Sequence, residues 1–167
     1  MIFVTVGTEK FPFDRLLRAL DEGLADGRIR GEVCVQAGCS TYASDRMQMV
    51  DRLPIERMAE KIRQAEAVVT HAGVGSVLLC YLLGVVPIVF PRRAELGEHV
   101  DDHQMEFARR MEREGELVAA YDGEDLLRAI AEYPDRLART RRPAPGNGTR
   151  LTDYLEDWLS GAGSARD

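Results

Sequence analysis

Short runs of β-branched and apolar residues alternate along the chain with segments whose apolar residues recur at the spacing of an α-helix. Residues 2–6 form the first such run, which ends at Gly7, and residues 13–24 follow with leucines at positions 16, 17, 20 and 24. Spacings of three and four residues place these leucines on one face of a helix. Strands that alternate with helices indicate a mostly parallel sheet with helices on both faces, so the expected fold class is α/β.

The same patterns place the remaining elements. Further strands are expected at residues 32–37, 46–50, 67–70, 85–90 and 116–119. Further helices are expected after Pro54, where Ile55, Met58, Ala59 and Ile62 form an apolar stripe, and at residues 75–83, 100–114 and 123–132. Residues 1–140 are therefore expected to form one domain.

The C-terminal part of the chain has a different character. A break rich in Pro and Gly at residues 141–149 is expected to be a linker. Residues 150–160 carry an apolar stripe at helical spacing, which predicts an amphipathic helix, and residues 161–167 resemble a frayed tail. The stripe consists of Leu151, Tyr154, Leu155, Trp158 and Leu159.

Composition and charge narrow the functional classes. The 167 residues are 45% apolar and 30% charged, which is the balance of an ordinary globular domain. The 28 acidic and 22 basic side chains argue against non-specific binding of nucleic acid, which needs a surplus of Lys and Arg. No run of eighteen apolar residues is present, so no membrane span is expected, and the apolar N-terminus is more typical of a strand than of a signal peptide.

Cys34, Cys39 and Cys80 are odd in number and lack the C-x-x-C spacing of metal or redox motifs. They indicate a reducing, cytosolic setting, and we expect them to be small buried apolar residues.

Ligands of such sheets bind in loops beyond the carboxyl ends of the strands. In the loop after the first strand, Gly7 lets backbone N–H groups approach a phosphate, and Thr8 adds a hydroxyl donor. The plainer alternative for this loop is an ordinary strand-to-helix turn.

The loop after the fourth strand carries the string THAGVGS. Gly73, Gly75 and Ser76 precede an apolar helix, whose N-terminal N–H groups and dipole favour an anion. The plainer alternative is close packing of strand and helix with a serine cap, and a partly buried, hydrogen-bonded His71.

The loop after the fifth strand carries the string ELGEHVDDHQ, dense in carboxylates, imidazoles and an amide that hydrogen-bond hydroxyl groups. On a helix, His99 and His103 would share one face, with Gln104 beside them. Metal ligands use the same spacing, and His71 or Asp102 could complete a metal site. A solvated, polar helix N-terminus is the plainer alternative.

Taken together, the strings FVTVGT, THAGVGS and GEHVDDHQ resemble the donor-binding half of GT-B glycosyltransferases related to family 28. The resemblance covers about residues 2–112 and is closest to the soluble catalytic subunit of the two-part UDP-N-acetylglucosamine transferase of dolichol-linked glycan synthesis. It extends to the bacterial glucuronosyltransferase subunits of exopolysaccharide assembly. It implies a Rossmann-like sheet forming a single GT-B half.

The resemblance also implies roles for individual residues. The glycine-rich turns face nucleotide and phosphate in the family, and the acidic-His-Gln region lies against the donor sugar. The donor-binding residues implied are Gly7, Thr8, His71, Gly73, Gly75, Ser76, Glu98, His99, Asp102, His103 and Gln104. Relatives often carry a ribose-binding glutamate three residues after the serine, whereas this chain has Leu79, so the nucleotide stays open.

The resemblance implies transfer of GlcNAc, glucose or glucuronic acid from a UDP-sugar to a lipid-linked saccharide acceptor. A membrane-associated partner subunit would bind the acceptor and recruit this chain to the cytoplasmic face of the membrane. His99 and His103 are the catalytic candidates here, although the partner is the more plausible source of the base that activates the acceptor. No D-x-D-type element is present, so we expect no metal and no cofactor besides the donor. The C-terminal helix could dock on the partner or on its own domain.

Two other functions remain open from the sequence. The chain could be a non-catalytic scaffold or nucleotide-binding subunit, because Leu79 signals altered ribose recognition. It could also be a metal-dependent hydrolase built on His71, His99, Asp102 and His103.

Overall fold

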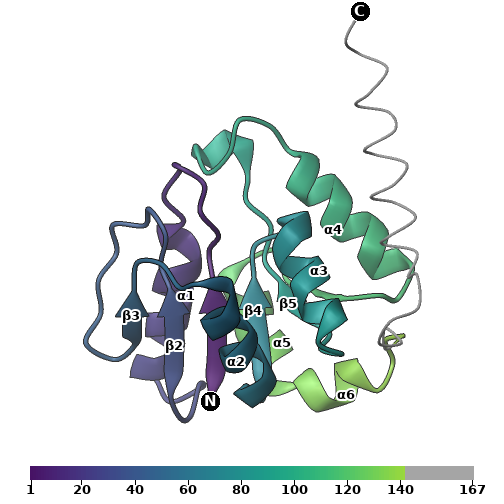
Figure 1. The fold of residues 1–167 in the computed structure, drawn as a ribbon, viewed down its shortest axis with the longest axis horizontal. Coiled ribbons are helices and arrows are strands. Elements are labelled where there is room, and N and C mark those ends of the chain that lie inside the picture. The colour runs from purple at the N-terminus through teal and green to yellow at the C-terminus, as the bar shows by residue number, and fades with distance from the viewer. Residues whose placement is uncertain (142–167) are drawn as a thin grey trace, which may run out of the picture.

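A computed structural model describes residues 1–141 of the chain (Figure 1). The expected linker, apart from Arg141, and the expected C-terminal helix and tail lie outside the described residues. The observed strands are β1 (Ile2–Thr5), β2 (Val33–Gln36), β3 (Gln48–Val50), β4 (Ala67–Thr70), β5 (Ile88–Val89) and β6 (Val118–Ala119). The helices are α1 (Asp14–Ala25), α2 (Ile55–Gln64), α3 (Val74–Leu82), α4 (His103–Arg113), α5 (Gly123–Ala131) and α6 (Tyr133–Leu137), with a 3-10 turn, η1, at Ala94–Leu96.

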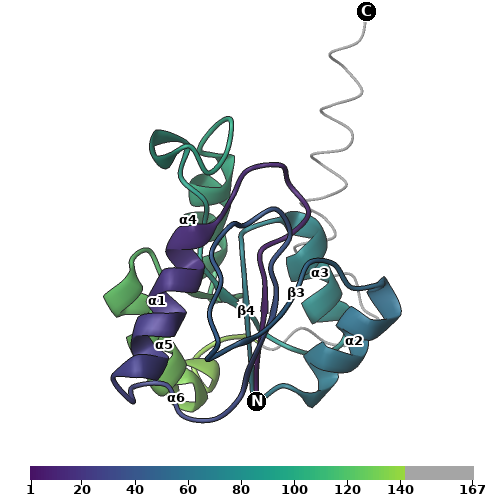
Figure 2. The same ribbon diagram turned by 90° about the vertical axis from the view of Figure 1, so that its left-hand side faces the viewer.

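The six strands form one parallel sheet in the order β3-β2-β1-β4-β5-β6. β1 pairs with β2 on one side and with β4 on the other, so the strand order reverses between β1 and β4. Figure 2 shows α1, α5 and α6 on one face of the sheet and α2 and α3 on the other. This confirms the expected α/β, Rossmann-like architecture with helices on both faces.

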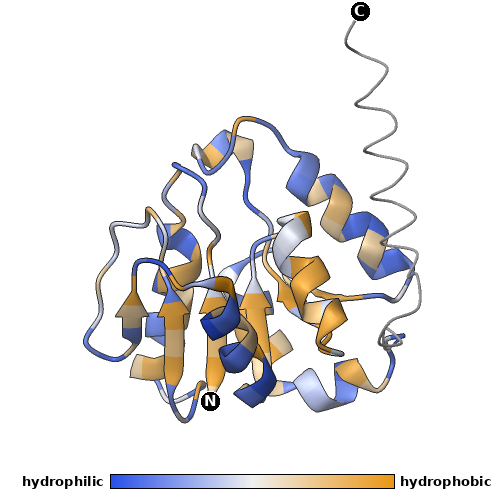
Figure 3. Cartoon of the chain, viewed as in Figure 1, coloured by the Kyte–Doolittle hydropathy of each residue, from blue (hydrophilic) through white to orange (hydrophobic). Residues whose placement is uncertain are grey.

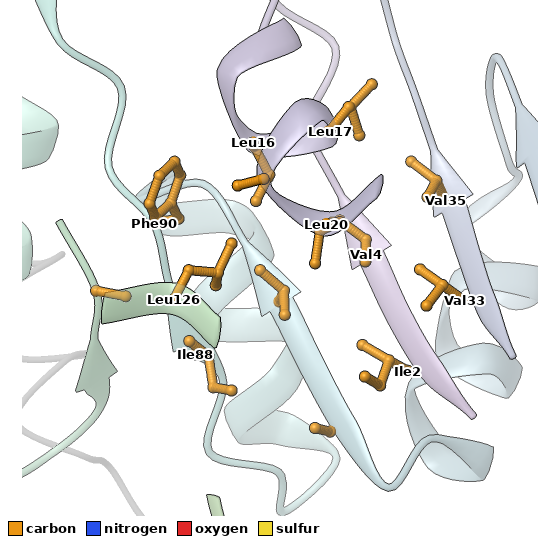
Figure 4. Packing of buried hydrophobic residues seen from close by; sticks show 14 of the residues in the cluster. Ile2, Val4, Leu16, Leu17, Leu20, Val33, Val35, Ile88, Phe90 and Leu126 are labelled. Atoms are coloured by element: carbon orange, nitrogen blue, oxygen red, sulfur yellow. The ribbon is translucent and has the colours of Figure 1, made fainter. Parts of the chain in front are cut away.

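The side chains of β1 alternate between the two faces of the sheet and contribute to the hydrophobic cluster on each face. Ile2 and Val4 point to the face covered by α1 and α5, where they pack with Leu16 and Leu20, as Figure 4 shows. Phe3 points to the opposite face and packs against Ile62 of α2. Successive residues of a strand face opposite sides, so a wholly buried strand needs apolar residues at each position.

A further cluster joins α3 and α4 on the α2 side of the sheet. Val77 and Tyr81 of α3 pack there with Phe107 and Met111 of α4 and with Val89 of β5. In Figure 3 the strands and α3 are predominantly hydrophobic, whereas α2 and much of α4 are hydrophilic. The apolar stripe of each amphipathic helix therefore faces the sheet or α3.

Helix α4 begins three residues later than the sequence pattern predicts, at His103 instead of residue 100. Gly97 has a φ of 68° after η1, and the Asp101 and Asp102 carboxylates accept backbone hydrogen bonds from His103 and Ala94. Aspartates that bond nearby backbone groups favour turns and helix starts over helix interiors. His99 therefore precedes the helix, and the expected placement of both histidines on one helical face is wrong.

Two further expectations need correction. Helix α6 was not predicted, because its five residues are too short to show a helical period. Cys34 and Cys80 are buried as expected, but Cys39 is exposed because it lies in the loop beyond β2. Within residues 1–141, no helix is long and apolar enough to cross a membrane.

Candidate functional site

A cavity of about 390 Å³ opens where the carboxyl ends of β1 and β4 meet the starts of α2 and α3. The strand order reverses at this point, which is where open α/β sheets bind ligands. The cavity is lined by Thr5, Gly7, Thr8, Glu9, Gln36, Leu53, Ile55, Met58, His71, Gly73, Gly75, Ser76 and Leu79. All the residues singled out in the first two glycine-containing loops thus share one cavity.

His71 forms a buried part of the cavity wall between two glycines. A Cβ on Gly7 would lie 2.5 Å from the His71 ring, and a Cβ on Gly73 would overlap its Nε2 atom. Gly7 also has a φ of +82°, which side chains other than glycine rarely adopt. These two positions therefore need glycine because the backbone wraps closely around the imidazole.

Burial, and after it the positive charge of Arg92, lower the pKa of His71 to about 4. The ring is consequently neutral near pH 7. A neutral imidazole can donate one hydrogen bond and accept another, so it offers the cavity a polar group without a charge.

A polar network holds the loop after β1 in place. The Thr5 hydroxyl donates to Gln36 and accepts a hydrogen bond from the Gly7 N–H at 3.3 Å. The Gln36 amide donates to the carbonyls of Gly7 (3.3 Å) and Asp51 (3.1 Å). Both side chains are buried at the ends of apolar strands, and their bonds fix the backbone that faces the cavity.

Two helix N-termini open onto the cavity. Ile55 begins α2, and Gly73 precedes the first residue of α3; neither cap position carries a side-chain hydrogen bond. The Ser76 N–H bonds to the Gly73 carbonyl at 3.0 Å, so Ser76 is not the expected serine cap of this helix. The first N–H groups of a helix lack partners within the helix, and the aligned peptide dipoles favour an anion there.

The opposite part of the cavity wall is apolar. It is formed by Leu53, Ile55 and Met58 around the start of α2 and by Leu79 of α3. The cavity therefore offers backbone N–H groups and an imidazole to a charged group, and aliphatic side chains to a flat or apolar one.

Glu98 lies at the next loop along the sheet and is buried in an ion pair. Its carboxylate accepts two hydrogen bonds from Arg15, at 2.8 and 2.9 Å, and one from the Arg93 N–H at 3.0 Å. The Arg15 guanidinium also lies 4.2 Å from the Phe90 ring centroid. Glu98 thus ties α1 to the loop after β5, a fixing role that the sequence did not reveal.

Gln104 is buried as well, and its side-chain oxygen accepts a hydrogen bond from the Arg92 N–H at 3.2 Å. Asp102 is exposed and accepts from the Ala94 N–H at 2.9 Å. Asp102 lines a separate polar hollow together with Arg93 and Arg109. These two residues therefore support the backbone around the start of α4.

His99, Asp101 and His103 cluster just before and at the start of α4. The rings of His99 and His103 lie 4.6 Å apart, and both Nδ1 atoms face the Asp101 carboxylate. The His103 backbone N–H, followed by the His103 side chain, lowers the pKa of Asp101. The two histidines lie close together because the turn before α4 folds back on the start of the helix, and not because they share a helical face.

The hydrolase alternative requires a metal site formed by His71, His99, Asp102 and His103. Among residues 1–141, the group with converging metal-ligand atoms is instead His99, Asp101 and His103. His71 stands between Gly7 and Gly73, so the expected four-residue set is not assembled.

The structure divides the candidate residues into two groups. Gly7, Thr8, His71, Gly73, Gly75 and Ser76 line the cavity, whereas Glu98, His99, Asp102, His103 and Gln104 surround the neighbouring loop. Sequence reasoning missed Thr5, Gln36 and Arg92, although each is a polar residue at or just beyond the carboxyl end of an apolar strand. That position was the available signal.

Comparison with known families identifies a match over nearly the whole chain. The family model described as glycosyltransferase family 28 C-terminal domain matches residues 1–148. A search of curated proteins gave no match.

Solved structures share the fold at low sequence identity. They include the glycotransferase of kitacinnamycin (19% identity, TM-score 0.59, 93% of this chain and 42% of that one) and SnogD from Streptomyces nogalater (17%, 0.52, 96% and 43%). A third is SsfS6 from Streptomyces sp. SF2575, complexed with thymidine diphosphate (22%, 0.54, 93% and 40%). The chain thus spans about two-fifths of the length of these structures.

Proposed function

We propose that this chain, which belongs to the family of glycosyltransferase family 28 C-terminal domains, binds the nucleoside diphosphate of a sugar donor in the cavity between β1 and β4. The observation that carries the proposal is the convergence of two helix N-termini with the Gly7–His71–Gly73 wall at the point where the strand order reverses. Fixed N–H groups and helix dipoles stabilise the charge that develops on a leaving diphosphate without needing a metal ion.

The two parts of the cavity fit the two parts of a nucleoside diphosphate. The diphosphate would lie at the N–H groups after Gly73 and along the turn at Gly7 and Thr8. The nucleoside would pack on the aliphatic side chains around Met58 and Leu79. The proposed nucleotide is UDP, and the proposed sugars are GlcNAc, glucose or glucuronic acid.

The donor sugar would project toward the loop before α4. His103 is 55% exposed there, and His99 is held against Phe11 with ring centroids 6.0 Å apart. Both are proposed to contact sugar hydroxyls or to move a proton. Glu98 and Gln104 would act indirectly, by fixing the loop that carries the histidines.

The acceptor is proposed to be bound by a second protein. The chain spans about two-fifths of the solved glycosyltransferases it resembles in fold. A membrane-associated partner would hold a lipid-linked saccharide and supply the base that activates its hydroxyl. The proposed reaction forms the new glycosidic bond as the anomeric carbon–oxygen bond to UDP breaks.

Ligand-detected NMR on the full chain tests the donor site, with UDP, dTDP, GDP and ADP and then the common UDP-sugars. The proposal expects selective binding of UDP, with further contacts from one sugar. A His103→Ala variant should keep the UDP signals and lose those of the sugar. Failure of every nucleotide to bind the chain, alone or with its acceptor subunit, would favour the scaffold alternative.

A further inference from the structure

Arg92 lies behind the cavity wall and is completely buried. It follows β5 and does not line the cavity itself. Its guanidinium lies 4.5 Å from the Phe13 ring centroid, so one face of the cation packs on an aromatic ring. A fully buried arginine is rare unless something stabilises its charge.

The hydrogen-bond partners of this guanidinium are backbone carbonyls from two loops. One terminal nitrogen donates to Val6 at 2.7 Å, and the other donates to Phe11 at 2.9 Å and Glu98 at 3.0 Å. The first two carbonyls lie in and around the loop after β1, and the third lies in the loop after β5. The arginine therefore clamps the cavity loop to the loop that carries the candidate sugar-binding residues.

No carboxylate among residues 1–141 forms a direct ion pair with Arg92; the charges of Glu98 and Glu9 act on its guanidinium without contacting it. The neighbouring Glu98 carboxylate instead accepts hydrogen bonds from the Nε and one terminal nitrogen of Arg15. The Arg92 Nε atom is also buried without a hydrogen-bond partner in this part of the chain. A cation held by neutral carbonyls projects its field into its surroundings, and a low-dielectric setting strengthens that field.

The field reaches the cavity. Arg92 binds the carbonyl of Val6, the residue before Gly7. Gly7 lines the cavity and lies against the His71 ring. The charge of Arg92 also contributes to the lowered pKa of His71. An anion bound at Gly7 and His71 would therefore experience an attractive potential from behind the wall.

We propose that Arg92 is a positioning residue that makes the cavity selective for nucleotides with two phosphates over those with one. Its fork sets the distance between the two loops, and its charge favours the additional negative charge of a diphosphate. This inference rests on the proposed function and adds a source of selectivity that does not touch the ligand.

The test compares the affinities of UDP and UMP in variants of the full chain. Arg92→Gln removes the charge and retains hydrogen-bond donors, whereas Arg92→Lys retains the charge and loses the fork. Arg63→Met is the control, because it removes one exposed charge at the last turn of α2, away from the cavity. Titration calorimetry and NMR of the His71 ring report affinity and pKa.

The expected result is a fall of about tenfold in the UDP preference over UMP in Arg92→Gln. The pKa of His71 should rise in the same variant, a change that a purely structural role of Arg92 would not require. Arg92→Lys should keep most of the preference with a lower melting temperature, and Arg63→Met should match the wild type.

An unchanged UDP preference in folded Arg92→Gln, or loss of that preference in folded Arg92→Lys, would overturn the inference. If Arg92→Gln does not fold, replacement of Arg92 by citrulline gives a neutral side chain of nearly the same shape, with the same expected and contrary results. A wild type that binds UMP as tightly as UDP would instead contradict the proposed diphosphate site. The two failures are thus distinguishable.

Discussion

Two neighbouring loops at the same edge of the sheet use their distinctive residues in different ways. The loop after β4 and the first turn of α3 bring Gly73, Gly75 and Ser76 to one cavity, with the buried His71 in its wall. The loop after β5 and the start of α4 divide their residues: Glu98 binds Arg15 and Gln104 binds the Arg92 backbone, while His103 stays exposed. A compact string of polar residues in a sequence can therefore contain both the fixing residues of a site and those free to meet a ligand.

The difference follows from what each loop must connect. The β4–α3 connection is short, so its backbone passes directly over the strand ends and needs glycines to approach His71. The β5–α4 connection is longer and forms a 3-10 turn. Its carboxylates accept hydrogen bonds from backbone N–H groups that have no partner in a helix or in the sheet.

The largest expected effect is a loss of stability on mild acidification, caused by His71. Its pKa is about 4 in the folded chain and near 6.5 when unfolded. Its contribution is therefore complete above pH 6.5 and declines as the pH falls toward 4, because the unfolded chain then binds the additional proton. The maximum loss is roughly 3 kcal/mol.

Denaturant unfolding between pH 7.5 and 4 measures this loss. His71→Gln should flatten the curve in that window. A wild-type curve that is flat between pH 6.5 and 4 would show that His71 is not buried in its neutral form.

A methyl group at Gly73 should disturb the cavity wall strongly, while the same change at Gly75 should not. A Cβ at Gly73 overlaps His71, but a Cβ at Gly75 would meet no atom within 4 Å beyond its chain neighbours and the nearby backbone of α3, among the described residues. We expect Gly73→Ala to lower the free energy of unfolding by about 2 kcal/mol and UDP affinity at least about tenfold.

The matched variant Gly75→Ala should retain the melting temperature and the His71 ring resonances of the wild type. Equal destabilisation by the two substitutions would contradict the close wrapping of His71 by Gly73.

Glu98→Gln should lower the free energy of unfolding by weakening the contacts that hold the loop after β5. The substitution removes the charge that pairs with Arg15, a side chain that is itself 24% exposed, so we expect a loss of about 1.5 kcal/mol. Chemical denaturation measures it, and hydrogen exchange of the Arg93 amide should quicken because its acceptor is weakened. A slowed or unchanged exchange rate at Arg93 would argue against a fixing role for Glu98.

The smallest stability effect is expected at His103, on the exposed side of the same loop. His103→Ala should change the free energy of unfolding by no more than about 0.5 kcal/mol, because the side chain is 55% exposed. The proposed sugar contact predicts that the variant nevertheless loses affinity for the UDP-sugar relative to UDP. A large loss of stability would move His103 into the fixing group with Glu98.

Much of the fold could be predicted because its signals are local. Short continuous apolar runs indicate the strands, apolar residues three to four positions apart indicate the helices, and the alternation of the two indicates a parallel sheet. The start of α4 could not be placed, since it depends on how Asp101 and Asp102 bond to nearby backbone groups. Helix α6 is too short to carry a period.

The candidate site was predictable where backbone geometry requires glycine. A glycine in each of these turns, at positions 7 and 73, indicates that the backbone closely approaches another group, even when the sequence does not say which group. The roles of Glu98 and Arg92 depend on partners 83 and 86 residues away in the sequence, Arg15 and Val6, so no local pattern encodes them. The residues that hold the loops in place differ from the exposed ones in having hydrogen-bond partners far away in the sequence.

The central claim is that a nucleoside diphosphate binds against the wall that contains His71. The most direct measurement is a titration of UDP into protein labelled at histidine, followed through the ring resonances of His71, His99 and His103. The account predicts a saturable shift of the His71 resonances at the same UDP concentrations that saturate ligand-detected binding. Saturable binding of UDP that leaves the His71 resonances unchanged would contradict it.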